Sequence, residues 1–556
     1  MDEKNSVSSR SVKKVRRKSK ADDYDRRQRW MYALLTVVLI GGLCAWWGLN
    51  GLFEREDTPD DQGQSDAPPV ISSSVGYSIS TSSEYATKAG AAILEQGGNA
   101  VDAAIAISYA LGVSEPYASG LGGGGCMVVY DPRMERFTFY NYGSEAPQSG
   151  NSWLTLVPGL VSGMEAVRKD FGTMDYAQLL QPALDCCDGV VINAISAMRI
   201  RNAAGGLPTS SPFYGPNGYL VEGDVLVQSE LKETLQCIVD EGPDAFYTGS
   251  IAQKIADGTY LKMSDLAAYR TIRTDAVVGT YRDYTVGTAA APFSGATLLQ
   301  MLKMAEALEI SDPDENRTDF LADLLKISQI SQYERLQNVC DLRFENIGMT
   351  QQEMVSNGYI AQILNLDVSD FTEEEECEDT TGFTVIDQDG MVVACTNTLS
   401  SFFGSRGYVG GFFMNNTGYL FGSGVNDWEK GKRPRTHISP AILVSDDEVI
   451  AVASPGGNLI TKVIANVLLD ICQFGEEAQT AIDKQRTVFL YGNVLYYEVG
   501  YKTPLLVEVA GCGYPSVAYS SHPYFGNVAL SGYREESGFY ATRDIRRGGY
   551  GMAANG

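Results

Sequence analysis

The sequence predicts a fold of the mixed α/β class, because helical and strand-like segments alternate from about residue 76 onward. A nearly all-apolar helical stretch over 99–113 precedes a glycine-rich turn and an apolar strand. Two strands rich in β-branched residues, 381–387 and 391–399, meet at a turn sequence. With 556 residues, of which 44% are hydrophobic, the chain suits one large or two to three typical domains.

The N-terminus predicts a single membrane anchor. Residues 1–29 carry 11 Lys and Arg against 5 Asp and Glu, and residues 30–53 carry no charge. These 24 residues could cross a hydrocarbon core of about 30 Å. The positive-inside rule predicts a cytoplasmic basic tail, a transmembrane signal-anchor helix, and an extracellular remainder at the cell membrane. The basic run could instead bind nucleic acid, but its place beside an apolar span favours topology. Residues 54–75, polar and rich in Pro and Ser, predict a flexible stalk.

Composition excludes several classes of function. The net charge of −26 argues against nucleic acid as a partner, because phosphate binding needs clustered Lys and Arg. The two histidines, His437 and His522, argue against a multi-histidine metal site and against a Ser-His-Asp triad. We therefore expect neither a metal nor a cofactor. The cysteines beyond the anchor lack regular spacing, which predicts buried free thiols.

The first helices have clear boundaries in the sequence. Residues 83–98 predict a helix that ends at Gly97-Gly98, and Asn99 is a suitable N-cap for the buried helix that follows. Further along, the sequence predicts a helix pair over 157–172 and 176–189, a short helix within 261–270 capped by Ser264, and a strand over 281–290.

A glycine-rich turn, GLGGGG, occupies residues 120–125. A phosphate-binding loop would continue into GK[ST] and a helix, whereas these glycines precede a strand. We expect instead a turn with positive φ or a close approach of two backbones.

The hairpin over 379–401 is the first place where chemistry could occur. If its loop is Gln388–Gly390 with a left-handed glycine, residue 387 pairs with 391 and Thr380 lies opposite Thr398. A two-residue loop would shift this pairing by one. Taken alone, facing threonines are usually a plain cross-strand pair.

The second such place lies in residues 433–475, where two predicted strands lead to Ser454-Pro455-Gly456-Gly457 and an apolar helix begins near Leu459. Consecutive glycine N–H groups at a helix N-terminus can bind an oxyanion or a carboxylate. Taken alone, this sequence is more often a plain strand-to-helix turn.

Together these motifs resemble the γ-glutamyltranspeptidase family over about residues 76–551. The matching segments are EQGGNAVDAA (95–104), EPYASGLGGGG (115–125), VPGLVSG (157–163), DTTGFTV (379–385), TNTL (396–399), GKRPRTHISP (431–440), SPGG (454–457) and GFYATRDIRRGGYG (538–551). The resemblance implies an N-terminal-nucleophile hydrolase fold with two sheets between helix layers, αββα. It also implies self-cleavage between Asp379 and Thr380, into large-subunit (76–379) and small-subunit (380–556) regions that remain associated.

The resemblance also assigns catalytic roles. Thr380 would be the nucleophile, and its new α-amine, with a reference pKa of about 7.7–8.0, would be the base. Thr398 matches the threonine that hydrogen-bonds the nucleophile, and Gly456 and Gly457 match the oxyanion-binding backbone donors. The expected cycle is acylation of Thr380 by an amide, followed by transfer to water or an amine.

The groups that bind a free glutamyl head depart from the family pattern. Gly143 stands where the family has its carboxylate-binding arginine, and Thr436 and His437 stand where it has two serines. Thr417 replaces the first amine-binding residue after Asn415-Asn416. We expect Ser400, Thr417, Thr436 and His437 to contact the substrate.

These departures predict a donor other than glutathione, such as a polymeric γ-glutamyl amide. Two alternatives stay open. The same nucleophile could act on a β-lactam side chain or another non-glutamyl amide. An uncleaved, non-catalytic homologue could serve as a surface binding module, although the retained Thr380, Thr398 and Gly456-Gly457 argue against it.

Overall fold

A computed structural model describes residues 70–215, 218–368, 379–490, 492–499, 513–520 and 522–556. The predicted basic tail, the predicted transmembrane helix (30–53) and most of the predicted stalk lie outside the described residues, as does the acidic segment before Asp379. Among the residues described, no helix is both long enough and apolar enough to cross a membrane.

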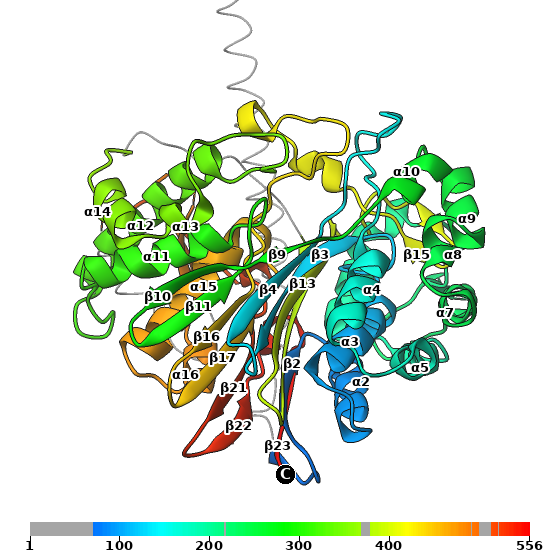
Figure 1. Cartoon of the computed structure of the whole chain (residues 1–556), viewed down its shortest axis with the longest axis horizontal. Coiled ribbons are helices and arrows are strands. Elements are labelled where there is room, and N and C mark those ends of the chain that lie inside the picture. Colours follow the sequence, from blue (N-terminus) through cyan, green and yellow to red (C-terminus); the bar gives the residue numbers. More distant parts are fainter. Residues whose placement is uncertain (1–69, 216–217, 369–378, 491, 500–512, 521) are drawn as a thin grey trace, which may run out of the picture. The chain divides into compact units, whose positions relative to one another are not determined.

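Two β-sheets face each other in the centre of the fold (Figure 1). The larger sheet has eight strands in the order β1 (Val70–Ile71), β23 (Tyr550–Asn555), β2 (Gly76–Thr81), β12 (Asp379–Asp387), β13 (Val392–Ser400), β3 (Gly124–Asp131), β4 (Arg136–Tyr142) and β9 (Ile272–Asp275). The second sheet has six strands in the order β10 (Val277–Tyr281), β11 (Tyr284–Thr288), β16 (Ala441–Val444), β17 (Glu448–Ala453), β21 (Ala529–Arg534) and β22 (Gly538–Ala541).

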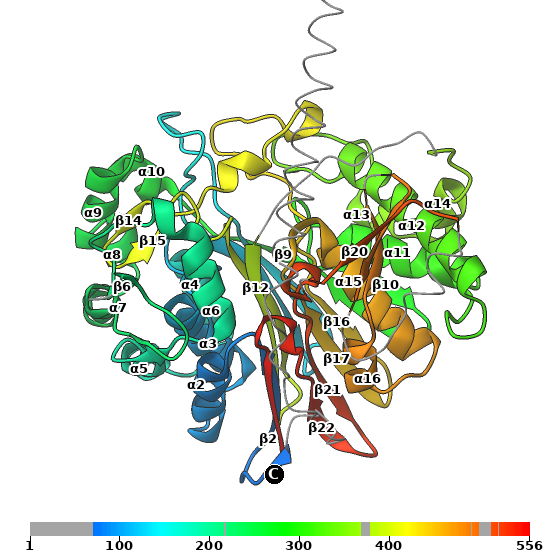
Figure 2. The same cartoon turned by 180° about the vertical axis from the view of Figure 1, so that it is seen from behind.

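Helices cover the outer face of each sheet, as both views show (Figures 1 and 2). The larger sheet carries α2 (Glu84–Glu95), α3 (Ala100–Ser114), α4 (Leu160–Phe171), α5 (Tyr176–Cys186), α6 (Ala194–Ala203), α7 (Ser229–Glu241), α8 (Asp244–Tyr247), α9 (Ser250–Gly258) and α10 (Met263–Ala268). The second sheet carries α11 (Gly295–Ala307), α12 (Arg317–Asn338), α13 (Gln351–Met354), α14 (Asn357–Ile363), α15 (Ile460–Leu468) and α16 (Ala478–Asp483), beside a small sheet of β18 (Thr487–Leu490), β19 (Val494–Glu498) and β20 (Ser516–Tyr519).

The alternation of side chains along β13 explains how one strand serves two cores. Val393 and Cys395 pack with the core beneath α2 and α3, whereas Val392 and Ala394 pack with the core that contains the second sheet. Successive strand residues point to opposite faces, so the first half of β13, which is buried on both faces, is apolar at consecutive positions. The predicted four-layer αββα arrangement is the one observed. The described cysteines are free thiols, as expected.

The predicted boundary between the first two helices is confirmed. Helix α2 ends at Glu95, and Gly97 follows with φ +91°, while Gly98 N–H donates to the Ile93 carbonyl at 3.0 Å. The Asn99 side chain accepts hydrogen bonds from the N–H groups of Val101 and Asp102, which caps α3 as predicted.

One local prediction is wrong, and one strand is shorter than predicted. Ser264 does not cap α10, because the helix begins at Met263 and its N-cap is Lys262, whose N–H donates to the Asp265 carboxylate at 2.9 Å. The strand predicted over 281–290 is present as β11, but it begins at Tyr284, because Tyr281 ends β10 and pairs with Tyr284 across a two-residue turn. Arg282 takes φ +52° in this turn, where the chain reverses.

The glycine-rich turn allows backbones to approach closely, as predicted. A Cβ atom on Gly123 would lie 2.3 Å from the Thr398 carbonyl oxygen, and one on Gly125 would lie 2.2 Å from the Thr396 carbonyl oxygen. The glycines therefore let β3 pack directly against β13 at the end that holds Thr398.

Strands from before and after residue 379 alternate in the larger sheet and meet once in the second sheet. In the larger sheet, β23 lies between β1 and β2, and the β12–β13 hairpin lies between β2 and β3. In the second sheet, β11 pairs with β16. The two regions of the chain therefore share their backbone hydrogen bonds and their cores.

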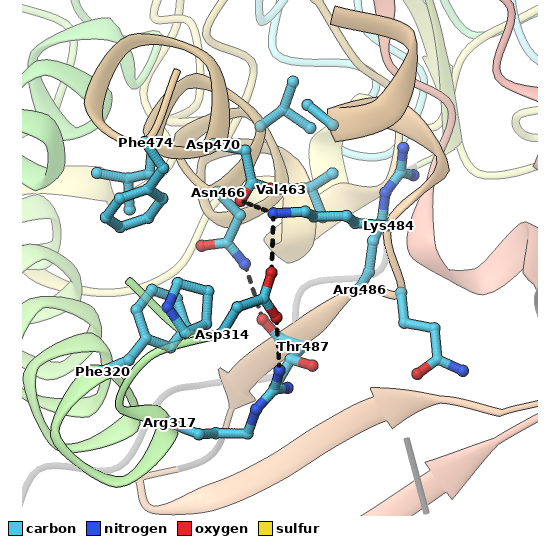
Figure 3. A pocket seen from close by; sticks show the side chains of 15 residues that line it. Asp314, Arg317, Phe320, Val463, Asn466, Asp470, Phe474, Lys484, Arg486 and Thr487 are labelled. Atoms are coloured by element: carbon cyan, nitrogen blue, oxygen red, sulfur yellow. Dashed lines mark hydrogen bonds and ion pairs between the residues drawn. The ribbon is translucent and has the colours of Figure 1, made fainter. Parts of the chain in front are cut away.

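A side cavity of about 370 Å³ lies between α12, α15 and the start of β18 (Figure 3). Its charged centre is Lys484, whose ammonium lies 3.1 Å from Asp470, 2.9 Å from Glu476 and 3.8 Å from Asp314. Burial raises the pKa of Asp470 to about 6, although Lys484 acts in the opposite direction. None of the predicted site residues lines this cavity.

The raised pKa of Asp470 predicts a pH-dependent stability. Because the folded state holds this proton more tightly than the unfolded chain, the contribution is fully present below about pH 4 and is lost as the pH rises through about 6. Unfolding at several pH values should show wild type gaining roughly 2–3 kcal/mol over Asp470→Asn between pH 7 and pH 4. The exposed Asp446→Asn is the control; parallel profiles for wild type and Asp470→Asn would contradict the prediction.

Close packing at the glycine-rich turn predicts that Gly123→Ala is strongly destabilising, by about 3 kcal/mol or more, because backbone atoms cannot move away from the added methyl group. The matched control is Gly358→Ala in α14, where an added Cβ meets nothing within 4 Å. Alanine should stabilise that helix by up to about 1 kcal/mol. Thermal unfolding of both variants measures the difference, and a Gly123→Ala variant as stable as wild type would refute the close approach.

Candidate functional site

The β12–β13 hairpin places Thr380 directly opposite Thr398. Its loop is the predicted three-residue one, because Asp387 N–H donates to the Met391 carbonyl at 3.1 Å and Gly390 takes φ +81°. The predicted register is therefore confirmed along the whole hairpin.

A β-bulge coincides with the predicted cleavage bond. Asp379 pairs with Ser400 while Thr380 pairs with Thr398, which leaves Leu399 as the extra residue of β13. Ser400 takes φ +79°, and its N–H donates to Thr398 Oγ1 at 2.8 Å. Ser400 is thus brought to the site, where its backbone fixes the Thr398 hydroxyl. Bulges occur often beside active sites because they redirect the chain locally.

Thr380 belongs to the face of β12 that meets the second sheet. On this face the Thr384 hydroxyl donates to Ser531 Oγ of β21 at 2.8 Å. Between Thr380 and Thr384 lies Gly382, where a Cβ would be 3.0 Å from Ser454 N. Thr380 is 2% exposed, and its Oγ1 has no hydrogen-bond partner among the described residues.

The Ser454–Gly457 turn lies beside this face of β12. It follows β17 directly, and Gly456 and Gly457 take φ +136° and +60° before α15 begins. Gly526 packs closely against this turn, since a Cβ atom at Gly526 would lie 2.4 Å from the Pro455 carbonyl oxygen. The turn thus presents glycine backbone at a helix N-terminus next to the strand that carries Thr380.

Thr417 is tied to the end of β13. Asn416 N–H donates to the Leu399 carbonyl at 3.1 Å, and Thr417 N–H donates to Asn415 Oδ1 at 3.2 Å. The Thr417 side chain is buried within a short 3₁₀ turn, Thr417–Leu420. The structure therefore places Thr417 next to the bulge.

Thr436 and His437 belong to a segment that packs against the start of α11. Thr436 N–H donates to the Pro292 carbonyl at 3.0 Å, and Ser294 Oγ donates to the Thr436 carbonyl. The fully buried Arg335 donates to Ser294 Oγ at 3.0 Å. Thr436 Oγ1 accepts the N–H of Ile438 at 2.8 Å, so this hydroxyl has a structural contact, and His437 is wholly buried.

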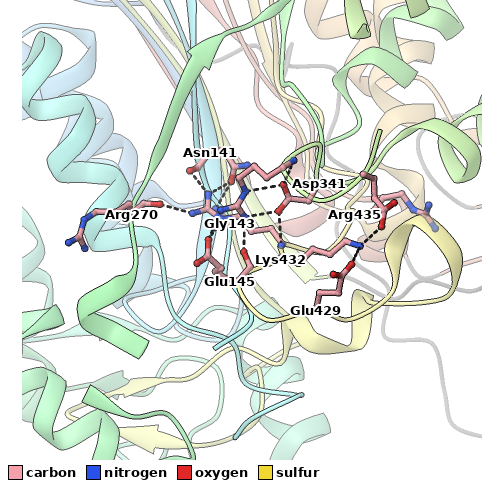
Figure 4. A network of polar contacts seen from close by, with 12 residues as sticks. Asn141, Gly143, Glu145, Arg270, Asp341, Glu429, Lys432 and Arg435 are labelled. Carbon is pink, nitrogen blue, oxygen red and sulfur yellow. Dashed lines mark hydrogen bonds and ion pairs between the residues drawn. The ribbon is translucent and has the colours of Figure 1, made fainter. Parts of the chain in front are cut away.

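A network of charged side chains, several of them buried, surrounds Gly143 (Figure 4). Arg433, 1% exposed, donates to Asn141 Oδ1 at 2.6 Å and to Glu145 at 3.2 Å. The Arg343 guanidinium forms ion pairs with two carboxylates, Glu145 at 3.1 Å and Asp341 at 2.6 Å. Burial alone would raise the pKa of Asp341, but the guanidinium of Arg343 outweighs burial and holds this pKa below its ordinary value. Sequence reasoning missed this network, whose only local signal is the basic segment 431–435.

A second buried carboxylate, Glu115, was also missed. It accepts hydrogen bonds from Thr381 Oγ1 at 2.7 Å, from Tyr117 OH at 3.0 Å and from Ser82 Oγ. The sequence places it at the end of a nearly all-apolar helix and at the start of the family-matching segment 115–125, but neither feature indicates its partners.

Comparison with known proteins agrees with this architecture. The Gamma-glutamyltranspeptidase family profile matches residues 86–554. The capsule biosynthesis protein CapD proenzyme of Bacillus anthracis is 37% identical over 531 residues, covering 93% of this chain and 96% of that protein. A glutathione hydrolase proenzyme of Bacillus subtilis (strain 168) is 29% identical over 586 residues, covering 94% and 98%.

Among solved structures, cephalosporin acylase from Bacillus halodurans superposes with a TM-score of 0.79 at 22% identity, covering 90% of this chain and 99% of that one. At this identity the similarity concerns the fold alone. The extent of the family match, together with the fold, shows that this chain belongs to the γ-glutamyltranspeptidase family of N-terminal-nucleophile hydrolases.

Proposed function

We propose that this chain is a membrane-anchored enzyme that cuts itself before Thr380 and then transfers a γ-glutamyl-type acyl group from an amide to water or an amine. The observation that carries the proposal is the position of Thr380, which lies opposite Thr398 on the face of β12 that meets the Ser454–Gly457 turn. This position supports a site in which Thr380 would be the nucleophile, Thr398 the neighbouring hydroxyl and the glycine turn the source of backbone donors.

Cleavage supplies the base that the chain otherwise lacks. The free α-amine of Thr380 accepts the proton of Thr380 Oγ1 as this oxygen attacks the amide carbonyl. The resulting ammonium gives the proton to the departing amine, which leaves an ester on Thr380. Water or a second amine then attacks the ester, its proton passes to the α-amine, and the threonine hydroxyl is restored.

The remaining groups stabilise this chemistry. Ser400 N–H fixes the Thr398 hydroxyl, which we propose then orients Thr380 Oγ1. The N–H groups of Gly456 and Gly457 would stabilise the oxyanion formed during attack, and such donors typically contribute about 2.7–4 kcal/mol to the transition state.

The donor is proposed to be a γ-glutamyl amide without the usual free glutamyl head, such as a polymer. Gly143 offers no guanidinium to an α-carboxylate, and the nearby Arg433 is already engaged by Asn141 and Glu145. The 37% identity to a capsule biosynthesis protein supports a polymeric donor. A non-glutamyl amide is the second candidate for the acyl donor. It is favoured by Gly143, because such an amide has no α-carboxylate that would need the missing arginine.

The proposed anchor is the charge-free segment 30–53, which would hold the catalytic domain, with large-subunit region 76–379 and small-subunit region 380–556, outside the cell membrane. The alternation of strands in the larger sheet, and the pairing of β11 with β16 in the second, support the proposal that the two fragments stay associated, since separating them would break backbone hydrogen bonds in both sheets.

Self-cleavage is tested first. Purified wild-type protein should show two fragments on a denaturing gel, the smaller beginning at Thr380, whereas Thr380→Ala should remain a single chain because it lacks the attacking hydroxyl. The control is Thr396→Ala, which removes another buried threonine hydroxyl of the same hairpin and should still be cut. A wild-type chain that stays whole would make the uncleaved binding module the leading interpretation.

Donor preference is tested next. Loss of a bidentate arginine–carboxylate contact costs about 2–5 kcal/mol, so kcat/KM for glutathione should be at least tenfold below that of the Bacillus subtilis enzyme measured alongside. A γ-linked glutamate oligomer should be the better donor, and a β-lactam acyl amide should be turned over poorly. Glutathione turnover equal to the reference enzyme would overturn the specificity argument, and preference for the β-lactam amide would favour the second candidate.

A further inference from the structure

The start of β12 is paired along one edge only. Its ladder with β13 reaches Thr380, but its ladder with β2 runs only from Asp387 to Thr384, which pairs with Ser80. Residues 380–383 therefore have no strand partner on the β2 side among the described residues. Chain ends with few backbone contacts tend to fray, and cleavage would make Thr380 a chain end.

The carboxylate of Glu115 lies where the β2 ladder stops. Its Oε2 accepts hydrogen bonds from Thr381 Oγ1 at 2.7 Å and from Ser82 Oγ. Ser82 directly follows β2, and Thr381 directly follows the proposed nucleophile. One carboxylate oxygen thus connects the two strands at the point where their backbone pairing ends.

Glu115 is itself held firmly. Its N–H donates to the Leu111 carbonyl at 2.7 Å at the end of α3, and its Oε1 accepts the Tyr117 hydroxyl at 3.0 Å. Burial, with the neighbouring carboxylate, raises the pKa of Tyr117 well above its ordinary value, so the tyrosine remains a donor.

The burial of Glu115 carries a cost. The residue is 6% exposed, and none of the described Lys and Arg side chains forms an ion pair with it. A buried carboxylate whose side-chain partners are hydroxyls alone costs more folding free energy than a neutral side chain would. We therefore infer that Glu115 has a role other than stabilising the fold.

We propose that Glu115 is a positioning residue that fixes Thr381, and through it the newly formed N-terminal Thr380, against the bulged end of β13. This inference rests on the proposed self-cleavage. Thr381 points to the helix side of the sheet and Thr380 to the opposite side, so anchoring Thr381 sets the direction of its neighbour. In the uncut chain the Asp379–Thr380 bond also restrains Thr380, so Glu115 matters more for turnover than for cleavage.

The test compares Thr381→Val, which keeps the shape but removes the hydroxyl, with Thr381→Ser, which keeps the hydroxyl. For cleaved enzyme acting on the γ-linked glutamate oligomer, kcat should fall at least tenfold in Thr381→Val with KM within about twofold, because misplacement by about 1 Å costs up to 10²-fold. Thr381→Ser should stay within about threefold of wild type. The rate of hydrogen–deuterium exchange at residues 380–383 should rise in Thr381→Val but not in Thr381→Ser.

Glu115→Gln should reproduce the valine phenotype, and the double variant should be no worse than either single one, because both act through one contact. A Thr381→Val enzyme with wild-type kcat per folded molecule, or losses that multiply in the double variant, would overturn the inference. If Glu115→Gln does not fold, the comparison of Thr381→Val with Thr381→Ser still tests the inference. A wild-type chain that stays uncut or inactive is the separate result that overturns the proposed function.

Discussion

The backbone ladder between β12 and β13 determines where each group of the site lies. It runs without interruption from Ile386 opposite Val392 to Thr380 opposite Thr398, and it breaks register only at the bond between Asp379 and Thr380. A slip of one residue would turn Thr380 toward the helices and away from the Ser454–Gly457 turn. Gly123 and Gly125 support this register from the neighbouring strand, because only glycine lets the backbone at the start of β3 approach the carbonyl oxygens of Thr398 and Thr396 so closely.

The two faces of the β12–β13 hairpin carry different groups. The face toward the second sheet holds the hydroxyls and the glycine turn, with Gly382 leaving room between them. The opposite face holds Glu115, which supports the strand without reaching the chemistry. Around Gly143, Arg343 and Arg433 form ion pairs with Glu145, and Arg343 also pairs with Asp341.

Local features of the site could be predicted from the sequence. The register followed from the left-handed glycine at 390, the N-cap followed from Asn99, and the SPGG turn followed from its place between a strand and an apolar helix. Glu115 could not be found in this way, because its partner Thr381 lies 266 residues along the chain. The same holds for the charge network around Gly143, where Arg433 and Asn141 are 292 residues apart. Contacts of this kind exist only after the two sheets have formed.

The position of β23 has a consequence for the timing of biosynthesis. This strand, residues 550–555, is inserted between β1 and β2, and β2 is the strand that pairs with β12. A ribosome makes β23 after every other strand of either sheet. The larger sheet, which holds Thr380, is therefore complete only after translation has passed residue 555.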